Sequence, residues 1–224
     1  MNTNSNITAV ITSCGRFNLL EKTLDSFFKQ NELLVDKTII IDNSTYPETE
    51  SEMVRIAKSL NISFDLICNE VNIGQVESID TAYSFIETDY IFHCEDDWEF
   101  YDSGFLTLSK ALLEDRPDIV NVNLRTRFDG EKGSMHPIGN LLISKSGVKY
   151  HEYERNYLGV WHGFSWNPGL RRKKEYDLIG SFKKYGDESA VGKFYKNQGY
   201  FSVCLEKSYC KHIGTHSSTP KSNQ

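Results

Sequence analysis

The chain has 224 residues, a formal net charge of −6 and a pI near 5.6. This acidic balance argues against the basic surface that grips a nucleic acid backbone, so no nucleic acid partner is expected. Hydrophobic residues make up 39% of the chain, as in a globular protein, and no apolar stretch approaches the roughly 20 residues of a membrane span. We therefore expect one compact domain over residues 1–224.

The N-terminus, MNTNSN, lacks the basic and then apolar layout of a secretory signal, which predicts a cytoplasmic protein. The cysteines argue the same way, because they are odd in number, scattered, and form no C-x-x-C pair. Neither a disulfide framework nor a structural zinc site fits that spacing, so reduced thiols are expected. The five are Cys14, Cys68, Cys94, Cys204 and Cys210.

Apolar strands and amphipathic helices alternate through the first half of the chain. Near-continuous apolar strands that alternate with helices predict an α/β fold with a mostly parallel central sheet flanked by helices. The predicted strands are 7–13, 38–42, 62–68 and 88–94, and the predicted helices are 16–30, 48–60 and 72–86.

Polar residues follow each of these strands, and in such sheets ligands bind at the carboxyl ends of the strands. We therefore expect one crevice to be lined by Thr12, Ser13, Cys14, Asp42, Asn43, Ser44, Asn69, Glu95, Asp96 and Asp97.

Three consecutive carboxylates, Glu95, Asp96 and Asp97, end the fourth strand in the stretch YIFHCEDDWEF. Two carboxylates about 4 Å apart repel by roughly 4 kcal/mol at an effective dielectric of 20, so the cluster needs solvent, a cation or a protonation shift. In an extended strand Glu95 and Asp97 project to the same side and could share a ligand. Carboxylates suit Mg²⁺ or Mn²⁺ held together with phosphates, and His212 or His216 in the tail could add an imidazole that favours Mn²⁺.

The second half of the chain is less regular. A helix is expected at 103–115 with Ser103 as its N-cap, then a strand at 119–124 and a loop at 125–140. An aromatic region at 150–170 precedes a helix that ends near 181, a helix at 187–198, a strand at 201–205 and a tail. The basic run RRKK, from Arg171 to Lys174, is typical of a solvated helix face.

Four stretches, each at a strand end and in the right order, give the chain a resemblance to the GT-A fold glycosyltransferases that use nucleotide sugars, and most closely to glycosyltransferase family 2. The resemblance covers nearly the whole chain. ITAVITSCGRFNLLEKTLDSF is similar to the opening strand and helix of that family, and IIIDNS to its second strand. NEVNIGQVESIDTAY is similar to the Asn-x-Gly stretch, and HCEDDWEF to the acidic metal motif.

The resemblance implies roles for the residues of the first half. The segment Thr12, Ser13, Cys14 and Arg16 would lie near the nucleotide, Asp42 would bind the base or ribose, and Asn72 and Gly74 would shape the diphosphate side. Asp97 takes the position of the metal ligand. Glu95 stands where the family usually has an aspartate near the ribose, which leaves open whether Glu95 or Asp96 has that role.

Sugar transfer from a diphosphate passes through an oxocarbenium-like state, and a divalent cation stabilises the charge that develops on the leaving group. An inverting transfer also needs a carboxylate that takes the proton of the acceptor hydroxyl. GDESAVGKFY is similar to the family's Glu-Asp motif with the two acids exchanged, which makes Glu188 the expected base and Asp187 the alternative. Both acids could instead merely stabilise a helix N-terminus.

The aromatic stretch WHGFSWNPGLRR lies where these enzymes build their acceptor side, which implies acceptor contacts for Trp161, Trp166 and Asn167, with Trp98 in addition. Aromatic faces pack on sugar C–H surfaces, but a core role for Trp161 or Trp166 is an equal alternative. Arg171 and Arg172 could contact an anionic acceptor or a donor phosphate.

The expected function is a metal-dependent, inverting glycosyltransferase that moves a sugar from a UDP-linked donor to a glycan or glycolipid. Residues from 1 to about 100 would bind the nucleotide and residues from about 101 to 224 the acceptor, with Mn²⁺ or Mg²⁺ as cofactor and at most peripheral membrane association. The alternatives are a non-catalytic nucleotide- or sugar-binding module and a nucleotidyltransferase, although SCGRFN is poor in the glycines and basic residues that a nucleotidyltransferase loop needs.

Overall fold

The computed structural model describes residues 6–31, 34–126, 138–155 and 158–214. The chain begins with four β-α pairs that include the predicted strands and helices. The elements in order are β1 (Ile7–Ser13), α1 (Phe17–Asn31), β2 (Lys37–Asp42), α2 (Thr49–Leu60), β3 (Asp65–Cys68), α3 (Gln75–Tyr83), β4 (Tyr90–Glu95), β5 (Trp98–Phe100), α4 (Phe105–Asp115), β6 (Ile119–Asn123), β7 (Ile138–Ile143), β8 (Lys149–Tyr153), β9 (Gly169–Arg172), α5 (Lys173–Ile179), α6 (Glu188–Asn197), β10 (Phe201–Leu205) and β11 (Cys210–His212).

One nine-stranded sheet, in the order β3-β2-β1-β4-β9-β6-β10-β8-β7, runs through both halves of the chain. Strands β3, β2, β1 and β4 are parallel neighbours, and β9 is antiparallel to both β4 and β6. Because β9 reverses direction between them, β6 and its parallel neighbour β10 run the same way as β4. The predicted α/β fold with a mostly parallel central sheet is confirmed.

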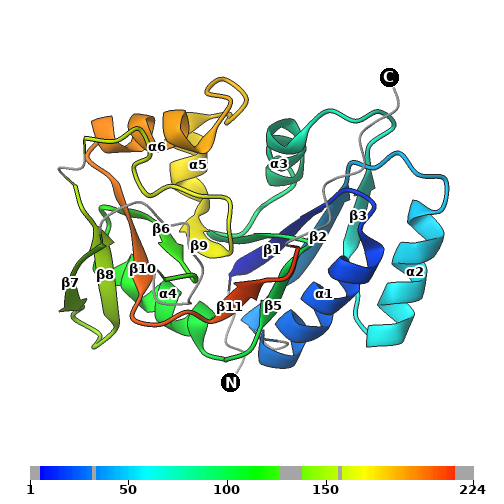
Figure 1. The fold of residues 1–224 in the computed structure, drawn as a ribbon, viewed down its shortest axis with the longest axis horizontal. Coiled ribbons are helices and arrows are strands. Elements are labelled where there is room, and N and C mark those ends of the chain that lie inside the picture. Colours follow the sequence, from blue (N-terminus) through cyan, green and yellow to red (C-terminus); the bar gives the residue numbers. More distant parts are fainter. Residues whose placement is uncertain (1–5, 32–33, 127–137, 156–157, 215–224) are drawn as a thin grey trace.

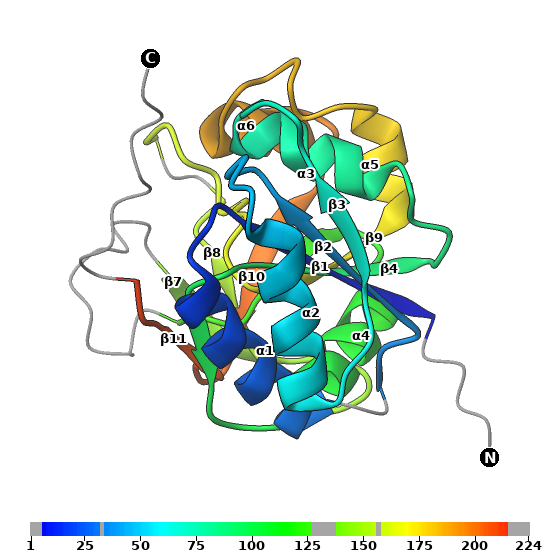
Figure 2. The same ribbon diagram turned by 90° about the vertical axis from the view of Figure 1, so that its right-hand side faces the viewer.

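Helices cover both faces of this sheet, with α1, α2 and α4 on one side and α3, α5 and α6 on the other (Figures 1 and 2). Each face has its own apolar core. The first core includes Leu24 and Phe27 of α1, and the second includes Tyr83 of α3 and Tyr195 of α6. Every side chain of the central strand β1 is buried, as expected for a strand between two helix layers. Its last residues, Thr12 and Ser13, and the following Cys14 therefore lie at the carboxyl edge of the sheet.

The N-terminal helices and strands agree with the prediction apart from their ends, and the second half departs from it more. Strand β3 begins at Asp65 rather than at 62, and Gly104, not Ser103, is the N-cap of α4, without a side-chain cap bond. The predicted loop at 125–140 lies mostly outside the described residues, but its last residues begin β7. The aromatic region contains β8 and the start of β9, and the tail adds β11, none of which was predicted.

The prediction of a solvated helix face at residues 171–174 is wrong for its two arginines. Arg171 and Arg172 belong to β9, which lies between β4 and β6, and their exposed fractions are 2% and 7%. Arg172 forms an ion pair with the buried Glu175 at 2.9 Å and also donates to the backbone carbonyl groups of Leu113, Pro117 and Ile119. With its donors used inside the protein, Arg172 is not available to a donor phosphate or an acceptor.

Replacing Arg172 with methionine is expected to lower the free energy of unfolding by about 3–5 kcal/mol, because Glu175 would keep a buried charge without its partner. Urea unfolding followed by circular dichroism measures this loss. The exposed Lys184→Met substitution is the matched control and should change stability by less than about 0.5 kcal/mol. A loss of similar size in both variants would contradict a structural role for the Arg172–Glu175 pair.

All five cysteines are free, as the sequence predicts. Within the described part of the chain, no helix has both the length and the apolar character needed to cross a bilayer.

Candidate functional site

A polar pocket of about 250 Å³ opens where β1 and β4 end, beside the N-terminus of α3. It brings together most of the residues that the sequence predicts to bind a nucleotide, and three that it does not single out for that role: Asn43, Gln75 and Ser78. The predicted residues in its wall are Thr12, Ser13, Cys14, Arg16, Asn72, Gly74, Glu95 and Asp96.

Asp42 is the predicted nucleotide-binding residue that lies outside this wall. Its carboxylate accepts hydrogen bonds from the backbone N–H groups of Gly15, at 3.0 Å, and Ser44, at 2.9 Å, and its side chain is buried. Asp42 lines a neighbouring cavity of about 180 Å³ with Tyr46 and Asn69. A side chain on Gly15, whose φ is +71°, would meet the Tyr46 ring, so this glycine allows the loop after β1 to close on Asp42.

The amide side chains of Asn43 and Asn72 join the loops after β2 and β3. Asn43 Nδ2 donates to Asn72 Oδ1 at 2.7 Å, and the same Asn72 oxygen accepts from the backbone N–H of Gly74 at 3.0 Å. Gly74 has a φ of +83°, which glycine adopts at little cost, and it starts α3. The Asn-x-Gly stretch therefore has a local structural reason, because it fixes the turn that leads into α3 beside the pocket.

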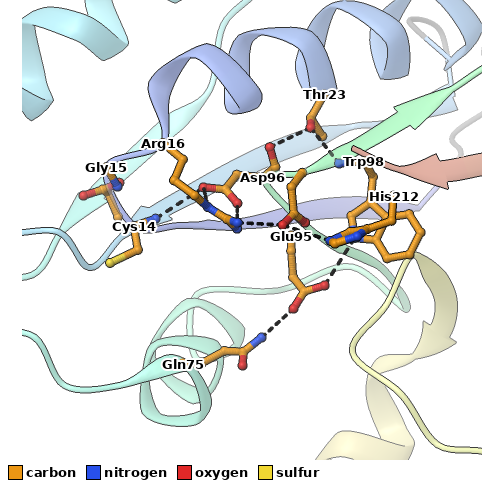
Figure 3. Close-up of polar contacts among 11 residues, drawn as sticks. Cys14, Gly15, Arg16, Thr23, Gln75, Glu95, Asp96, Trp98 and His212 are labelled. Atoms are coloured by element: carbon orange, nitrogen blue, oxygen red, sulfur yellow. Dashed lines mark hydrogen bonds and ion pairs between the residues drawn. The ribbon is translucent and has the colours of Figure 1, made fainter. Parts of the chain in front are cut away.

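Arg16 lies between two of the three carboxylates (Figure 3). Its guanidinium group donates to both oxygens of Asp96, and its Nη1 donates to Asp97 Oδ2 at 2.7 Å. Burial raises the pKa of Asp96 to about 6, although the positive charge of Arg16 acts in the opposite direction. Arg16 thus offsets the repulsion between Asp96 and Asp97 in the site.

Asp97 and His212, the two predicted metal ligands, lie together although 115 residues separate them in the sequence. Strand β11 pairs antiparallel with β5, which places His212 Nε2 3.1 Å from Asp97 Oδ2. The other carboxylate oxygen, Asp97 Oδ1, is buried and has no hydrogen-bond partner among the described residues. His216, the alternative ligand, lies outside the described residues.

These two side chains fit a hard divalent cation. An unpartnered buried carboxylate oxygen and an adjacent imidazole are a donor set that Mn²⁺ accepts, and ions of this kind complete their coordination with water and substrate phosphates. Within the described residues no group of three His, Cys, Asp or Glu side chains converges. The protein would therefore supply few ligands, and Gly214 keeps this corner tight because a Cβ there would collide with Asp97.

Both carboxylate oxygens of Glu95 accept hydrogen bonds within the protein, and the alternation expected between Glu95 and Asp97 is interrupted. Strand β4 ends at Glu95, and the bend at Asp96 and Asp97 breaks the period of two before β5. Glu95 Oε1 accepts from Gln75 Nε2 at 2.8 Å, and its Oε2 accepts from Trp98 Nε1 at 3.2 Å. Burial and the charge of Asp97 raise the pKa of Glu95 to about 7.

The structure separates the two acids proposed as the base. Asp187 is the N-cap of α6, and its Oδ1 accepts from the backbone N–H of Ala190 at 2.8 Å. Glu188 Oε1 instead accepts from Ser165 Oγ at 2.9 Å and from the Trp166 N–H at 2.6 Å. Burial raises the pKa of Glu188, and the charge of Glu188 is one of the smaller causes that raise the pKa of Glu95.

The tryptophans differ in their exposure. Trp98 and Trp166 are buried, with exposed fractions of 1% and 5%, and belong to the two cores. Trp98 also contacts His212, with ring centroids 5.1 Å apart. Trp161 is half-buried and donates through Nε1 to the carbonyl group of Phe164 at 2.6 Å, and Asn167 is half-buried at the end of the same segment. The core alternative therefore holds for Trp166, and Trp98 lies in a core although no core role was predicted for it.

Comparison with known proteins agrees with this geometry. The pattern of the family described as Glycosyl transferase family 2 matches residues 8–180, which is more than half of the chain and includes the whole acidic motif. The chain belongs to glycosyl transferase family 2. Its predicted resemblance to that family is therefore confirmed, and no curated protein sequence matches it.

Solved glycosyltransferase structures share the fold. The mannosyltransferase PcManGT from Pyrobaculum calidifontis, solved in complex with GDP-Man and Mn²⁺, is 15% identical, with a TM-score of 0.70 over 96% of this chain and 58% of its own. TarS 1–349 of S. aureus, in complex with UDP, is 13% identical, with a TM-score of 0.63 over 91% of this chain and 59% of its own. This chain thus spans under two thirds of either neighbour. At these identities the likeness shows the GT-A fold alone.

Proposed function

We propose that this family 2 member is a metal-dependent, inverting glycosyltransferase that moves a sugar from a nucleotide diphosphate donor, UDP-linked, to the hydroxyl group of a glycan or glycolipid. The observation that carries the proposal is the contact between Asp97 and His212 beside a polar pocket at the ends of β1 and β4. A nucleotide site and a cation site then adjoin, as transfer from a diphosphate requires.

In this proposal the nucleotide lies in the pocket formed by the loops after β1 and β2 and the start of α3. Backbone N–H groups at the start of α3 favour the negative charge of a diphosphate, and Gly74 lets the phosphates approach the backbone. Asp97 and His212 would hold Mn²⁺ or Mg²⁺, which stabilises the charge of the leaving group when bound. Arg16 adds a positive charge at the same corner.

Glu188 is the proposed base. Its Oε1 is fixed by two donors, which leaves Oε2 to accept the proton of an acceptor hydroxyl. A raised pKa brings a carboxylate closer to the working pH, which makes it a better proton acceptor. Ser165 and Trp166, which donate to Glu188, lie between Trp161 and Asn167 in the chain. We keep Trp161 and Asn167 as the proposed acceptor contacts, and the buried Trp98 and Trp166 would support the site from within the core.

In this proposal the two halves of the chain bind different substrates. Residues up to about 100 would bind the donor and later residues the acceptor, within one domain in the cytoplasm. Membrane association would be at most peripheral, and it would not involve Arg171 or Arg172, which are buried.

The test is donor turnover. With Mn²⁺ present, the protein is expected to release UDP from at least one of UDP-glucose, UDP-galactose, UDP-N-acetylglucosamine and their uronic acid counterparts, with GDP-mannose as the competing nucleotide class. NMR of the released or transferred sugar gives the anomeric outcome, which should be inverted. Donor binding without any turnover would favour the non-catalytic module, and transfer of the nucleotidyl group would favour the nucleotidyltransferase.

A further inference from the structure

A second pocket, of about 190 Å³, lies away from the donor pocket, between β8, the segment that contains His162, and the start of β10. Aromatic side chains from three places in the chain form part of its wall: Tyr153, Tyr200 and Phe201. In Figure 1, β10 begins just after α6 and runs beside β8. None of the residues that line this pocket belongs to the site described above.

The polar groups of this pocket are unusual because several have no partner. The hydroxyl group of Ser202, in a residue with an exposed fraction of 1%, is buried without a hydrogen bond in the described part of the chain. Glu154 and Lys196 lie in the exposed part of the wall, and neither has an ion-pair partner among the described residues. A buried hydroxyl group without a partner costs free energy unless something that enters the pocket bonds to it.

Other contacts fix the shape of the wall. The Arg155 guanidinium lies 3.6 Å from the ring centroid of Phe201, where it covers one face of that ring, and it pairs with Glu152 at 3.1 Å. Gly163, with a φ of +84°, packs so closely on Tyr153 and Ser202 that a Cβ there would clash with the Tyr153 ring. Tyr200 is half-buried and presents the less covered aromatic side chain.

The Tyr200 ring, the Ser202 hydroxyl group and the charged groups of Glu154 and Lys196 together match the chemistry of a sugar ring. Aromatic faces pack on the C–H face of a pyranose, and polar groups of both kinds bond its hydroxyl groups. This pocket is smaller than the donor pocket, with about 190 Å³ against about 250 Å³. The wall carries two cationic side chains, Arg155 and Lys196, and one acid, Glu154, and Arg155 already pairs with Glu152 outside the wall.

The second pocket lies at the other end of the helix that begins with the proposed base, Glu188. Glu188 begins α6 and Lys196 lies eight residues later in the same helix, a rise of about 12 Å at 1.5 Å per residue. The segment of residues 161–165 makes a second connection, because His162 lines the pocket and Ser165 donates to Glu188. A short oligosaccharide could span this distance.

We infer that this pocket binds a sugar unit of the acceptor at a distance from the reacting hydroxyl, so that the acceptor is an oligosaccharide or polysaccharide chain rather than a single sugar. The inference rests on the proposed function for its purpose. The binding of a sugar ring in the pocket, however, is measurable without turnover.

The experiment follows the backbone amide resonances of Gly199, Tyr200 and Ser202 by NMR while the methyl glycosides of glucose, N-acetylglucosamine and glucuronic acid are added separately. At least one glycoside should shift these resonances in a saturable way. Tyr200→Ala should weaken that binding about fivefold, the size of effect expected from one aromatic contact, and Ser202→Val should weaken it as well. Tyr101→Ala, which removes an exposed aromatic side chain elsewhere, is the matched control and should leave binding unchanged.

The inference is overturned if none of the three glycosides shifts these resonances, or if Tyr200→Ala and Ser202→Val leave the shifts as they are in the wild type. Titration of UDP with Mn²⁺ into the same variants separates this outcome from failure of the proposed function. Variants of the second pocket should bind the nucleotide like the wild type. Binding of glycosides without binding of any nucleotide would contradict the proposed transferase function but support the sugar site.

Discussion

Glu188→Gln is expected to reduce sugar transfer by about 10²–10⁴-fold, the usual contribution of a general base, while nucleotide binding remains as in the wild type. Glutamine has nearly the same shape and can still accept from Ser165 and Trp166 through its carbonyl oxygen, but it cannot take the proton of the acceptor hydroxyl. The measurements are the transfer rate at saturating donor and the Kd of the nucleotide with Mn²⁺.

Asp187→Asn is the matched control for that substitution. Asparagine is as good an N-cap as aspartate, so α6 should remain and transfer should stay within a few-fold of the wild type. If Asp187→Asn removed transfer and Glu188→Gln did not, the roles of the two acids would be exchanged, as in the usual order of the family motif.

The pH profile follows from the same residue. Because burial raises the pKa of Glu188, its base form is lost on acidification at a higher pH than for an ordinary glutamate, and transfer should fall as the pH drops through that raised pKa. The sign for stability is opposite, because a raised pKa in the folded state makes ionisation of Glu188 cost stability as the pH rises. A rate that increased on acidification would contradict the assignment of Glu188 as a base.

The second large effect is expected at Asp97. Asp97→Asn should abolish metal-supported nucleotide binding, because the substitution removes the charge that would hold the cation and replaces one ligand oxygen with an amide group. Calorimetric titration of nucleotide in the presence of Mn²⁺ measures the change, and binding without metal supplies the baseline.

Glu99→Gln is the control for Asp97→Asn, since Glu99 is an acid two residues later that pairs with Lys211 on the surface. It changes the net charge by the same amount close to the site, and it should leave nucleotide binding unaltered. An equal loss in the two variants would mean that general electrostatic attraction, and not a ligand at Asp97, supports binding.

The sequence predicted which residues line the pocket at the ends of β1 and β4, because strands and helices alternate regularly there. Once β1 and β4 are recognised, their ends must meet at one edge of the sheet, and Thr12 and Asp96 then lie in one pocket. Gln75 had no such signal, since its role depends on where the first turn of α3 points. Trp98 illustrates the same limit, because its place next to an acidic motif indicated a sugar contact, whereas its side chain is buried in the core.

The second half was harder to predict because its strands are short and pair over long distances. Strand β11 has three residues and forms only by pairing with β5, which lies more than 100 residues earlier, so local propensity does not reveal it. Strand β9 runs into α5 within RRKK, and Arg172 can be buried there because Glu175 and backbone carbonyl groups accept from its guanidinium group. A run of four basic residues gives no sign of such partners.

The most direct test of the central claim is a calorimetric titration of UDP, and separately of GDP, into the purified protein with Mn²⁺ and then with EDTA. Binding of UDP is expected to require Mn²⁺ and to disappear with EDTA, because Asp97 and His212 would hold the cation that offsets the charge of the diphosphate. Failure of both nucleotides to bind, with or without Mn²⁺, would contradict it and would leave HCEDDWEF as an acidic bend neutralised by Arg16 alone.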